Sequence, residues 1–87
     1  MGTRLFVGNI SSGCTEHSLR VLFESQGWSV NDAVIVTDRA TGRSRGFGFV
    51  EFERSDEAQA ALRQMNGHHL DGRPLSLREA HQRTPRR

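Results

Sequence analysis

The chain lacks the features of a disulfide-stapled or membrane-spanning protein. It has a single cysteine, Cys14, so no disulfide can form within it. No apolar run approaches the ~20 residues that a helix needs to cross a bilayer. A chain of 87 residues has room for one hydrophobic core. We therefore expect a single soluble, intracellular domain with a cytoplasmic location, or a nuclear one if the host is a eukaryote.

Lysine and tyrosine are absent as well, and all twelve basic side chains are arginines. Arginine pairs with phosphate through parallel N–H groups and stacks on bases, whereas lysine offers a point charge. The sequence contains two arginine clusters: Arg39, Arg43 and Arg45 in the middle of the chain, and Arg83, Arg86 and Arg87 at its end. A GC-rich genome would also enrich arginine, but such clusters are what binding to an anionic polymer needs.

The hydrophobic pattern predicts alternating strands and helices. Apolar or β-branched stretches predict strands at residues 4–10, 33–37, 46–53 and 74–79. Apolar residues at helical spacing predict two helices, with Thr15 and Ser55 as their N-caps. A tight turn at Asp71 and Gly72 is expected to lead into the last strand. The order βαββαβ predicts an α+β, ferredoxin-like sandwich: a four-stranded antiparallel sheet with two helices on one face.

Strand alternation then assigns side chains to the two faces of this sheet. The helices are expected to cover an all-apolar set: Leu5, Val7, Val50 and Phe52. Phe6, Phe47 and Phe49 are left on the open face. Burying one such ring is worth ~1.5–3 kcal/mol, so three exposed rings indicate a binding surface. Alternatively, a terminal segment or a dimer partner covers these three rings.

Two segments resemble the signatures of the RNA recognition motif family. They are residues 5–10 (LFVGNI) and residues 45–52 (RGFGFVEF). The resemblance covers roughly residues 3–80, with the two signatures about 40 residues apart, as in the family. It assigns residues 1–81 to the motif and leaves residues 82–87 as an arginine-rich tail that we expect to be flexible.

The resemblance implies that the domain binds single-stranded RNA. In the family, bases stack on the aromatic side chains that correspond here to Phe6, Phe47 and Phe49. Single-stranded DNA is expected to bind more weakly. The resemblance implies neither a cofactor nor a membrane, and we expect a monomer.

Five further residues complete the expected RNA-binding set. Arg45 resembles the residue of the family that pairs with phosphate. Arg78 and His81 lie in the stretch that resembles the family's base-reading segment. Arg39 and Arg43 flank the turn between the second and third strands, where we expect them to contact phosphates.

One stretch departs from the family pattern. Between Gly27 and Asp38 the chain has one residue more than is common, and a β-bulge would absorb it. This leaves open whether Val34 and Val36 point to the open face. Trp28 is expected to pack at the sheet edge rather than to stack on a base.

The sequence offers little for catalysis or metal binding. Cys14 and His17 lack a third residue to orient them, and the adjacent His68 and His69 lack a zinc-like spacing. We therefore expect no enzyme activity and no metal. The alternative function is a protein-interaction module of the same fold that uses the exposed aromatic face.

Overall fold

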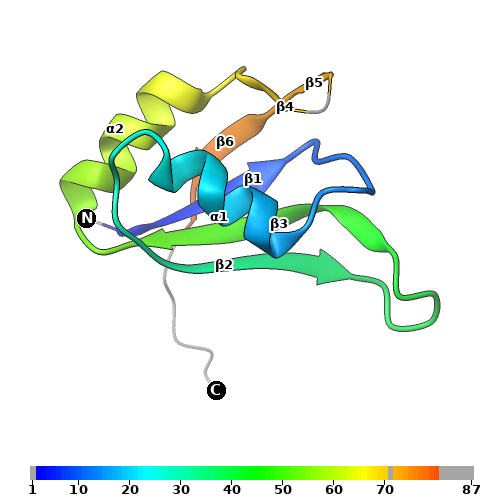
Figure 1. Ribbon diagram of the computed structural model, residues 1–87. Coiled ribbons are helices and arrows are strands. Elements are labelled where there is room, and N and C mark those ends of the chain that lie inside the picture. Colours follow the sequence, from blue (N-terminus) through cyan, green and yellow to red (C-terminus); the bar gives the residue numbers. More distant parts are fainter. Residues whose placement is uncertain (1, 71, 81–87) are drawn as a thin grey trace.

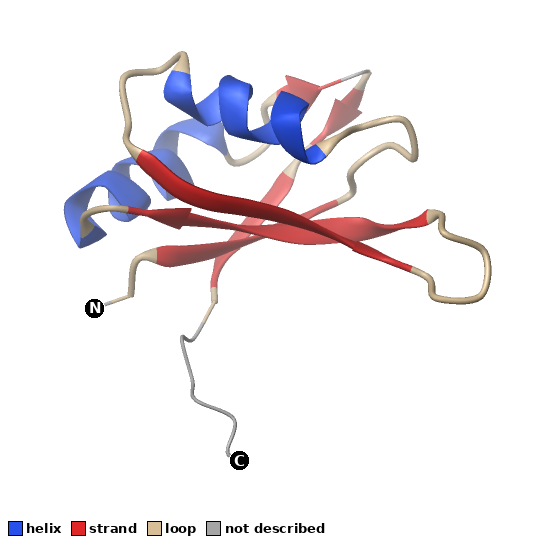
Figure 2. Ribbon diagram, turned by 60° about the horizontal axis from the view of Figure 1, so that its bottom comes forward, coloured by secondary structure: helices blue, strands red, loops and turns tan. Residues whose placement is uncertain are grey.

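The computed structural model describes residues 2–70 and 72–80. Its elements follow in the order β1 (Arg4–Gly8), α1 (Glu16–Glu24), β2 (Val30–Thr37), β3 (Ser44–Phe52), α2 (Ser55–Met65), β4 (His69–Leu70), β5 (Arg73–Pro74) and β6 (Ser76–Glu79). Four strands form an antiparallel sheet in the order β2-β3-β1-β6. Both helices lie on one face of it (Figures 1 and 2). The predicted ferredoxin-like sandwich is confirmed.

The core fills the space between the sheet and the helices, as alternation predicts. Leu5, Val7 and Val50 are fully buried, and Phe52 is 1% exposed. The helices contribute Leu19, Phe23, Ala58, Ala61 and Met65 to the same core. Helix α1 packs mainly on β2, and α2 lies over β1, β3 and β6. The opposite face of the sheet is left uncovered by helices.

Strand β2 begins at Val30, three residues before the predicted start at Ala33. The pairing of β2 with β3 shifts between Val30 and Asp32, and this irregularity absorbs the extra residue. Beyond it, Val34 pairs with Phe49 and is 40% exposed, so it belongs to the open face.

Trp28 packs against the core, as expected. Its ring centroid lies 6.4 Å from that of Phe23 and 6.3 Å from that of Phe52. The indole therefore closes the helix side of the sheet and is not available to a ligand on the open face.

The two helices begin differently. Thr15 caps α1, as predicted, because its side chain accepts a hydrogen bond of 3.0 Å from the Ser18 amide. The prediction that Ser55 caps α2 is wrong. Arg54 has the extended backbone of an N-cap (φ −129°, ψ 147°) and makes no side-chain cap, so Ser55 is the first helical residue.

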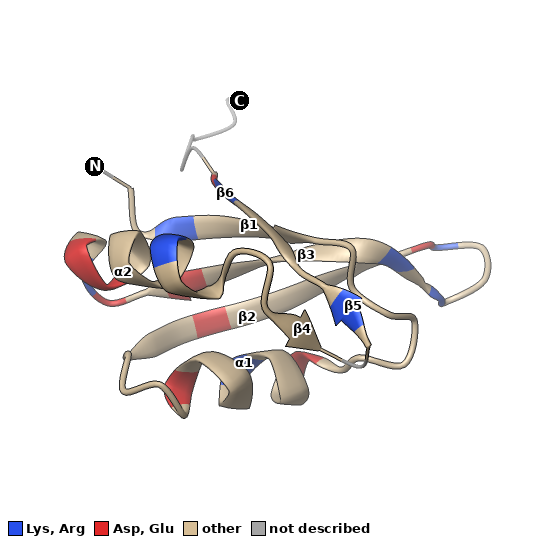
Figure 3. Cartoon of the chain, turned by 90° about the horizontal axis from the view of Figure 1, so that it is seen from above, with Lys and Arg blue, Asp and Glu red and all other residues tan. Residues whose placement is uncertain are grey.

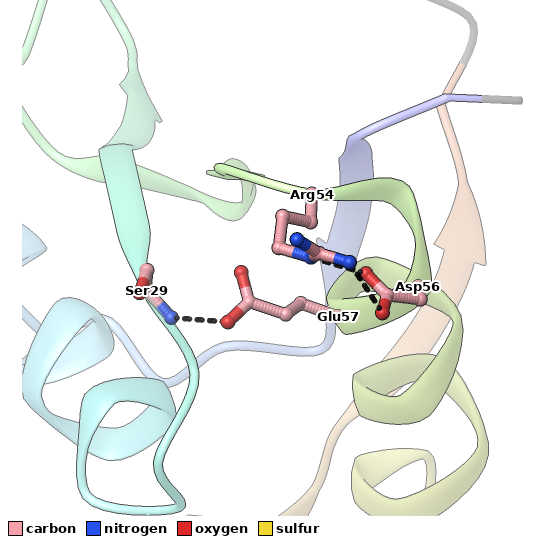
Figure 4. A network of polar contacts seen from close by, with 4 residues as sticks. All are labelled: Ser29, Arg54, Asp56 and Glu57. Carbon is pink, nitrogen blue, oxygen red and sulfur yellow. Dashed lines mark hydrogen bonds and ion pairs between the residues drawn. The ribbon is translucent and has the colours of Figure 1, made fainter.

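Charged contacts hold the start of α2 instead (Figure 4). Arg54 donates hydrogen bonds of 3.0 and 3.3 Å to the Asp56 carboxylate. These bonds lower the pKa of Asp56 and raise the pKa of Arg54. Glu57 accepts a hydrogen bond of 3.2 Å from the Ser29 amide. The first turn of α2 is thereby joined to the segment that enters β2.

A small hairpin precedes the last strand, and the sequence did not predict it. His69 pairs with Pro74, and Leu70 pairs with Arg73, in a separate two-stranded sheet. Gly72 of the expected turn lies between β4 and β5 with φ +79°, whereas Asp71 lies outside the described residues. The last strand of the main sheet starts at Ser76 rather than at residue 74. Pro74 has no N–H to donate to a neighbouring strand. His81 and the tail at residues 82–87 lie outside the described residues.

Candidate nucleic-acid interface

Three phenyl rings meet on the uncovered face of the two central strands. Phe6 of β1 lies directly opposite Phe49 of β3, and Phe47 lies opposite Gly8. The Phe6 centroid is 5.6 Å from that of Phe47 and 5.8 Å from that of Phe49, and the last two rings are 6.4 Å apart. All three are half-buried. We call these three residues the aromatic cluster.

Two arginines lie against this aromatic cluster. The Arg78 guanidinium carbon is 5.1 Å from the Phe6 centroid, and that of Arg4 is 5.8 Å from the Phe49 centroid. Cations at such distances are attracted to the ring faces. Arg78 was predicted at the site, whereas Arg4 was missed. Arg4 lies two residues before Phe6 on the same strand, so strand alternation alone would have found it.

A bulge separates Arg45 from the aromatic cluster. The segment from Ile35 to Thr37 of β2 faces the longer segment from Ser44 to Gly48 of β3. Gly46 within it has φ +89°, a conformation that favours glycine. The backbone therefore turns at Gly46, between Arg45 and Phe47. Arg45 is exposed. Because the bulge interrupts the alternation of side chains along β3, alternation does not assign Arg45 to a face of the sheet.

Gly48 lies where β2 and β3 approach each other closely. A Cβ on this residue would lie 2.1 Å from the Val34 carbonyl oxygen, which is backbone and cannot move aside cheaply. The glycine therefore lets β2 and β3 approach while Phe47 and Phe49 point to the other face.

Arg39 and Arg43 are exposed on the loop between β2 and β3. Figure 2 shows this loop projecting beyond the end of the sheet, and Figure 3 shows basic segments along it and on the adjoining part of β3. Two backbone bonds of 2.7 Å, from Gly42 N to Asp38 O and from Asp38 N to Arg43 O, close the loop. The loop thus presents its cations outside the aromatic cluster.

A small pocket lies beside Phe49 on the open face. It is lined by Arg4, Asp32, Val34, Phe49 and Glu51. Arg4 forms an ion pair of 3.1 Å with Glu51, and the Thr3 hydroxyl donates to the same carboxylate at 3.0 Å. Asp32 was not predicted at the site because the irregularity after Val30 hid its face from a count along the sequence.

Other chemistry has little support in the described part of the chain. Cys14 is a free, buried thiol. Within residues 2–70 and 72–80, no cluster of three or more histidine, cysteine, aspartate or glutamate side chains could hold a metal ion. No helix among these residues is long and apolar enough to cross a membrane.

An open-faced α+β sandwich with aromatic side chains on its two central strands defines a class of binding domain. The model of the RNA recognition motif family matches residues 5–76. The chain belongs to this family, and the resemblance of its two signatures is confirmed.

Proteins similar to this chain include two from Arabidopsis thaliana. The chain is 45% identical over 84 residues to the chloroplastic RNA-binding protein CP29B, covering 97% of this chain and 29% of that protein. It is 44% identical to the mitochondrial glycine-rich RNA-binding protein 4, covering 97% of this chain and 61% of that protein. The chain thus spans less than two thirds of either relative.

Solved structures share the fold. The crystal structure of RNA binding protein PG1 has a TM-score of 0.86 at 37% identity, over 95% of this chain and 99% of that one. The RNA15 RRM with bound RNA has a TM-score of 0.80 at 29% identity, over 92% of this chain and 84% of that one.

The comparisons correct one expectation. A cytoplasmic location was predicted, but the named relatives include chloroplastic and mitochondrial proteins. The prediction rested on the lack of disulfides and apolar runs, and these features do not distinguish the cytoplasm from the interior of an organelle.

Proposed function

We propose that this domain binds single-stranded RNA on the open face of its sheet and catalyses no reaction. The observation that carries the proposal is the aromatic cluster: three half-buried rings with centroids within 6.4 Å of one another, on the face that no helix covers. Stacking on such rings contributes ~1–3 kcal/mol per base and tolerates any base, because every base has a π face.

The arginines supply the second part of the proposal. Arg39, Arg43 and Arg45 are exposed around the loop that projects from the sheet, where they would contact phosphates. Arg78 lies over Phe6 and would flank a base stacked there. His81 and the arginines of residues 82–87 are proposed contacts from outside the described residues. Two of the relatives are RNA-binding proteins, and the RNA15 RRM structure contains bound RNA, which supports this assignment.

Titration of the domain with a fluorescent single-stranded RNA, with the matching RNA duplex as control, tests the proposal. The single strand should bind more tightly, since only its bases are free to lie on the rings. DNA of the same sequence should bind more weakly than the RNA. If neither single strand binds, the aromatic cluster serves another purpose, and the protein-interaction alternative replaces RNA binding.

A further inference from the structure

Cross-strand pairing arranges the open face beside Phe49 in two adjacent rows. In one row Phe6 pairs with Phe49, and Phe49 pairs with Val34. In the next row Arg4 pairs with Glu51, and Glu51 pairs with Asp32. The first row is apolar and the second is charged. A base stacked on Phe49 would therefore have charged side chains beside its edge.

The two carboxylates of the charged row differ in their partners. Glu51 accepts hydrogen bonds from Thr3 and from Arg4, at 3.0 and 3.1 Å. Asp32 is exposed, and no residue in the described part of the chain donates to its carboxylate. The pocket lined by these residues thus contains one carboxylate whose oxygens are available.

Arg4 adds a donor to the same pocket. Its Nη2 atom is engaged by Glu51, but its Nε atom is buried and has no acceptor among the described residues. The Arg4 side chain as a whole is 38% exposed and lines the pocket, so guanidinium N–H groups that do not bond Glu51 can donate to an acceptor of a ligand. The pocket therefore offers a hydrogen-bond acceptor, Asp32, on one side of Glu51 and a donor, Arg4, on the other side.

We propose that this pocket selects guanine for the base stacked on Phe49, an inference that rests on the proposed RNA binding. Guanine presents two adjacent N–H donors, N1–H and N2–H, which one carboxylate can accept together. Asp32 accepts both hydrogens, and Arg4 donates to the neighbouring O6. Guanine is the one RNA base with this pair of donors.

The other bases match the pocket less well. Uracil has a single ring N–H, which lies between two carbonyl oxygens. These oxygens and the Asp32 carboxylate repel each other. Adenine and cytosine each offer one amino group and can make one such bond with Asp32. A bidentate contact of this kind discriminates between bases by roughly tenfold or more.

The test uses short uridine-rich RNAs that differ only in one central base. The domain should bind the guanine-containing RNA about tenfold more tightly than the all-uridine RNA. Inosine lacks the N2 amino group and should lose most of this preference. 7-Deazaguanine keeps the N1, N2 and O6 groups and should bind like guanine.

Variants locate the preference. Asp32→Asn should abolish the guanine preference, because the asparagine side chain places an N–H donor against an N–H donor of the base. The variant should still bind the all-uridine RNA. Glu53→Gln is the matched control: it removes the same charge from an exposed residue just after β3, outside the pocket, and should keep the preference.

The outcomes separate this inference from the proposed function. If the domain binds all the RNAs equally, RNA binding stands and guanine selection is wrong. A guanine preference that survives Asp32→Asn, or that inosine retains, also overturns the inference. If no RNA binds, the proposed function itself is wrong.

Discussion

At the scale of single residues, the two faces of β3 separate stability from binding. Phe52 is 1% exposed and stacks edge-on against Phe23, with centroids 5.6 Å apart. Phe52→Ala should lower the free energy of unfolding by ~3–5 kcal/mol, the usual effect of truncating a core phenylalanine. Thermal melts of the variant measure this loss directly.

Phe47→Ala and Phe49→Ala are the counterparts on the open face. Each should keep the fold, because both rings are only half-buried, and should weaken binding of single-stranded RNA by ~1–3 kcal/mol, the contribution of one stacked base. RNA titrations and melts of the same proteins distinguish the two effects. Unfolding of either variant would show that its ring belongs to the core. Parent-like binding by both would remove stacking from the mechanism.

Gly48 permits a residue-scale test of strand spacing. Gly48→Ala places a methyl carbon 2.1 Å from the Val34 carbonyl oxygen, so β2 and β3 must separate locally. Overpacking typically costs ~1–3 kcal/mol, and we expect at least that loss in a denaturant titration. Gly13→Ala is the control, since its Cβ meets no atom within 4 Å and should leave stability nearly unchanged. Equal stability of the two variants would contradict the close approach of the strands.

At the scale of elements, the helix starts provide a paired test. Thr15→Ala removes the hydrogen bond to the Ser18 amide and should cost about 1 kcal/mol. Ser55→Ala should leave stability unchanged or raise it by a few tenths of a kcal/mol, because Ser55 is a helical residue without a capping role and alanine is the better helix former. Urea titrations compare the two. If Ser55→Ala loses more stability than Thr15→Ala, Ser55 acts as the N-cap of α2.

The elements also show how far the sequence leads. Alternation placed Phe6, Phe47 and Phe49 correctly because β1 and the end of β3 are regular. Alternation along the sequence does not assign Asp32 or Arg45 to a face of the sheet. Each residue lies at an irregularity in the β2–β3 pairing, which is visible only in the register of the two strands. The β4–β5 hairpin was missed because two-residue strands carry no periodic pattern.

At the scale of the whole molecule, charge should govern the salt dependence of RNA binding. The arginines of residues 82–87 have no acidic residue among them. Deleting these residues should flatten the slope of log affinity against log salt while base preference stays the same. Thermal stability should not change, since the last strand, β6, ends at Glu79, before the deleted residues. An unchanged slope would exclude these arginines from the interface.

The loop between β2 and β3 makes the matching prediction inside the folded domain. Arg39 and Arg43 are exposed on a loop that extends beyond the sheet, so they should contact phosphates without reading bases. Replacing both with alanine should reduce the magnitude of the salt slope by about 1.4, at ~0.7 for each phosphate of a single strand. Affinity should fall equally for every RNA sequence. Arg63→Ala removes an exposed charge from the last turn of α2, on the helix side of the sheet, and should leave the slope unchanged. If the loop variant instead loses affinity for one base selectively, the loop reads sequence, and base recognition extends beyond the aromatic cluster.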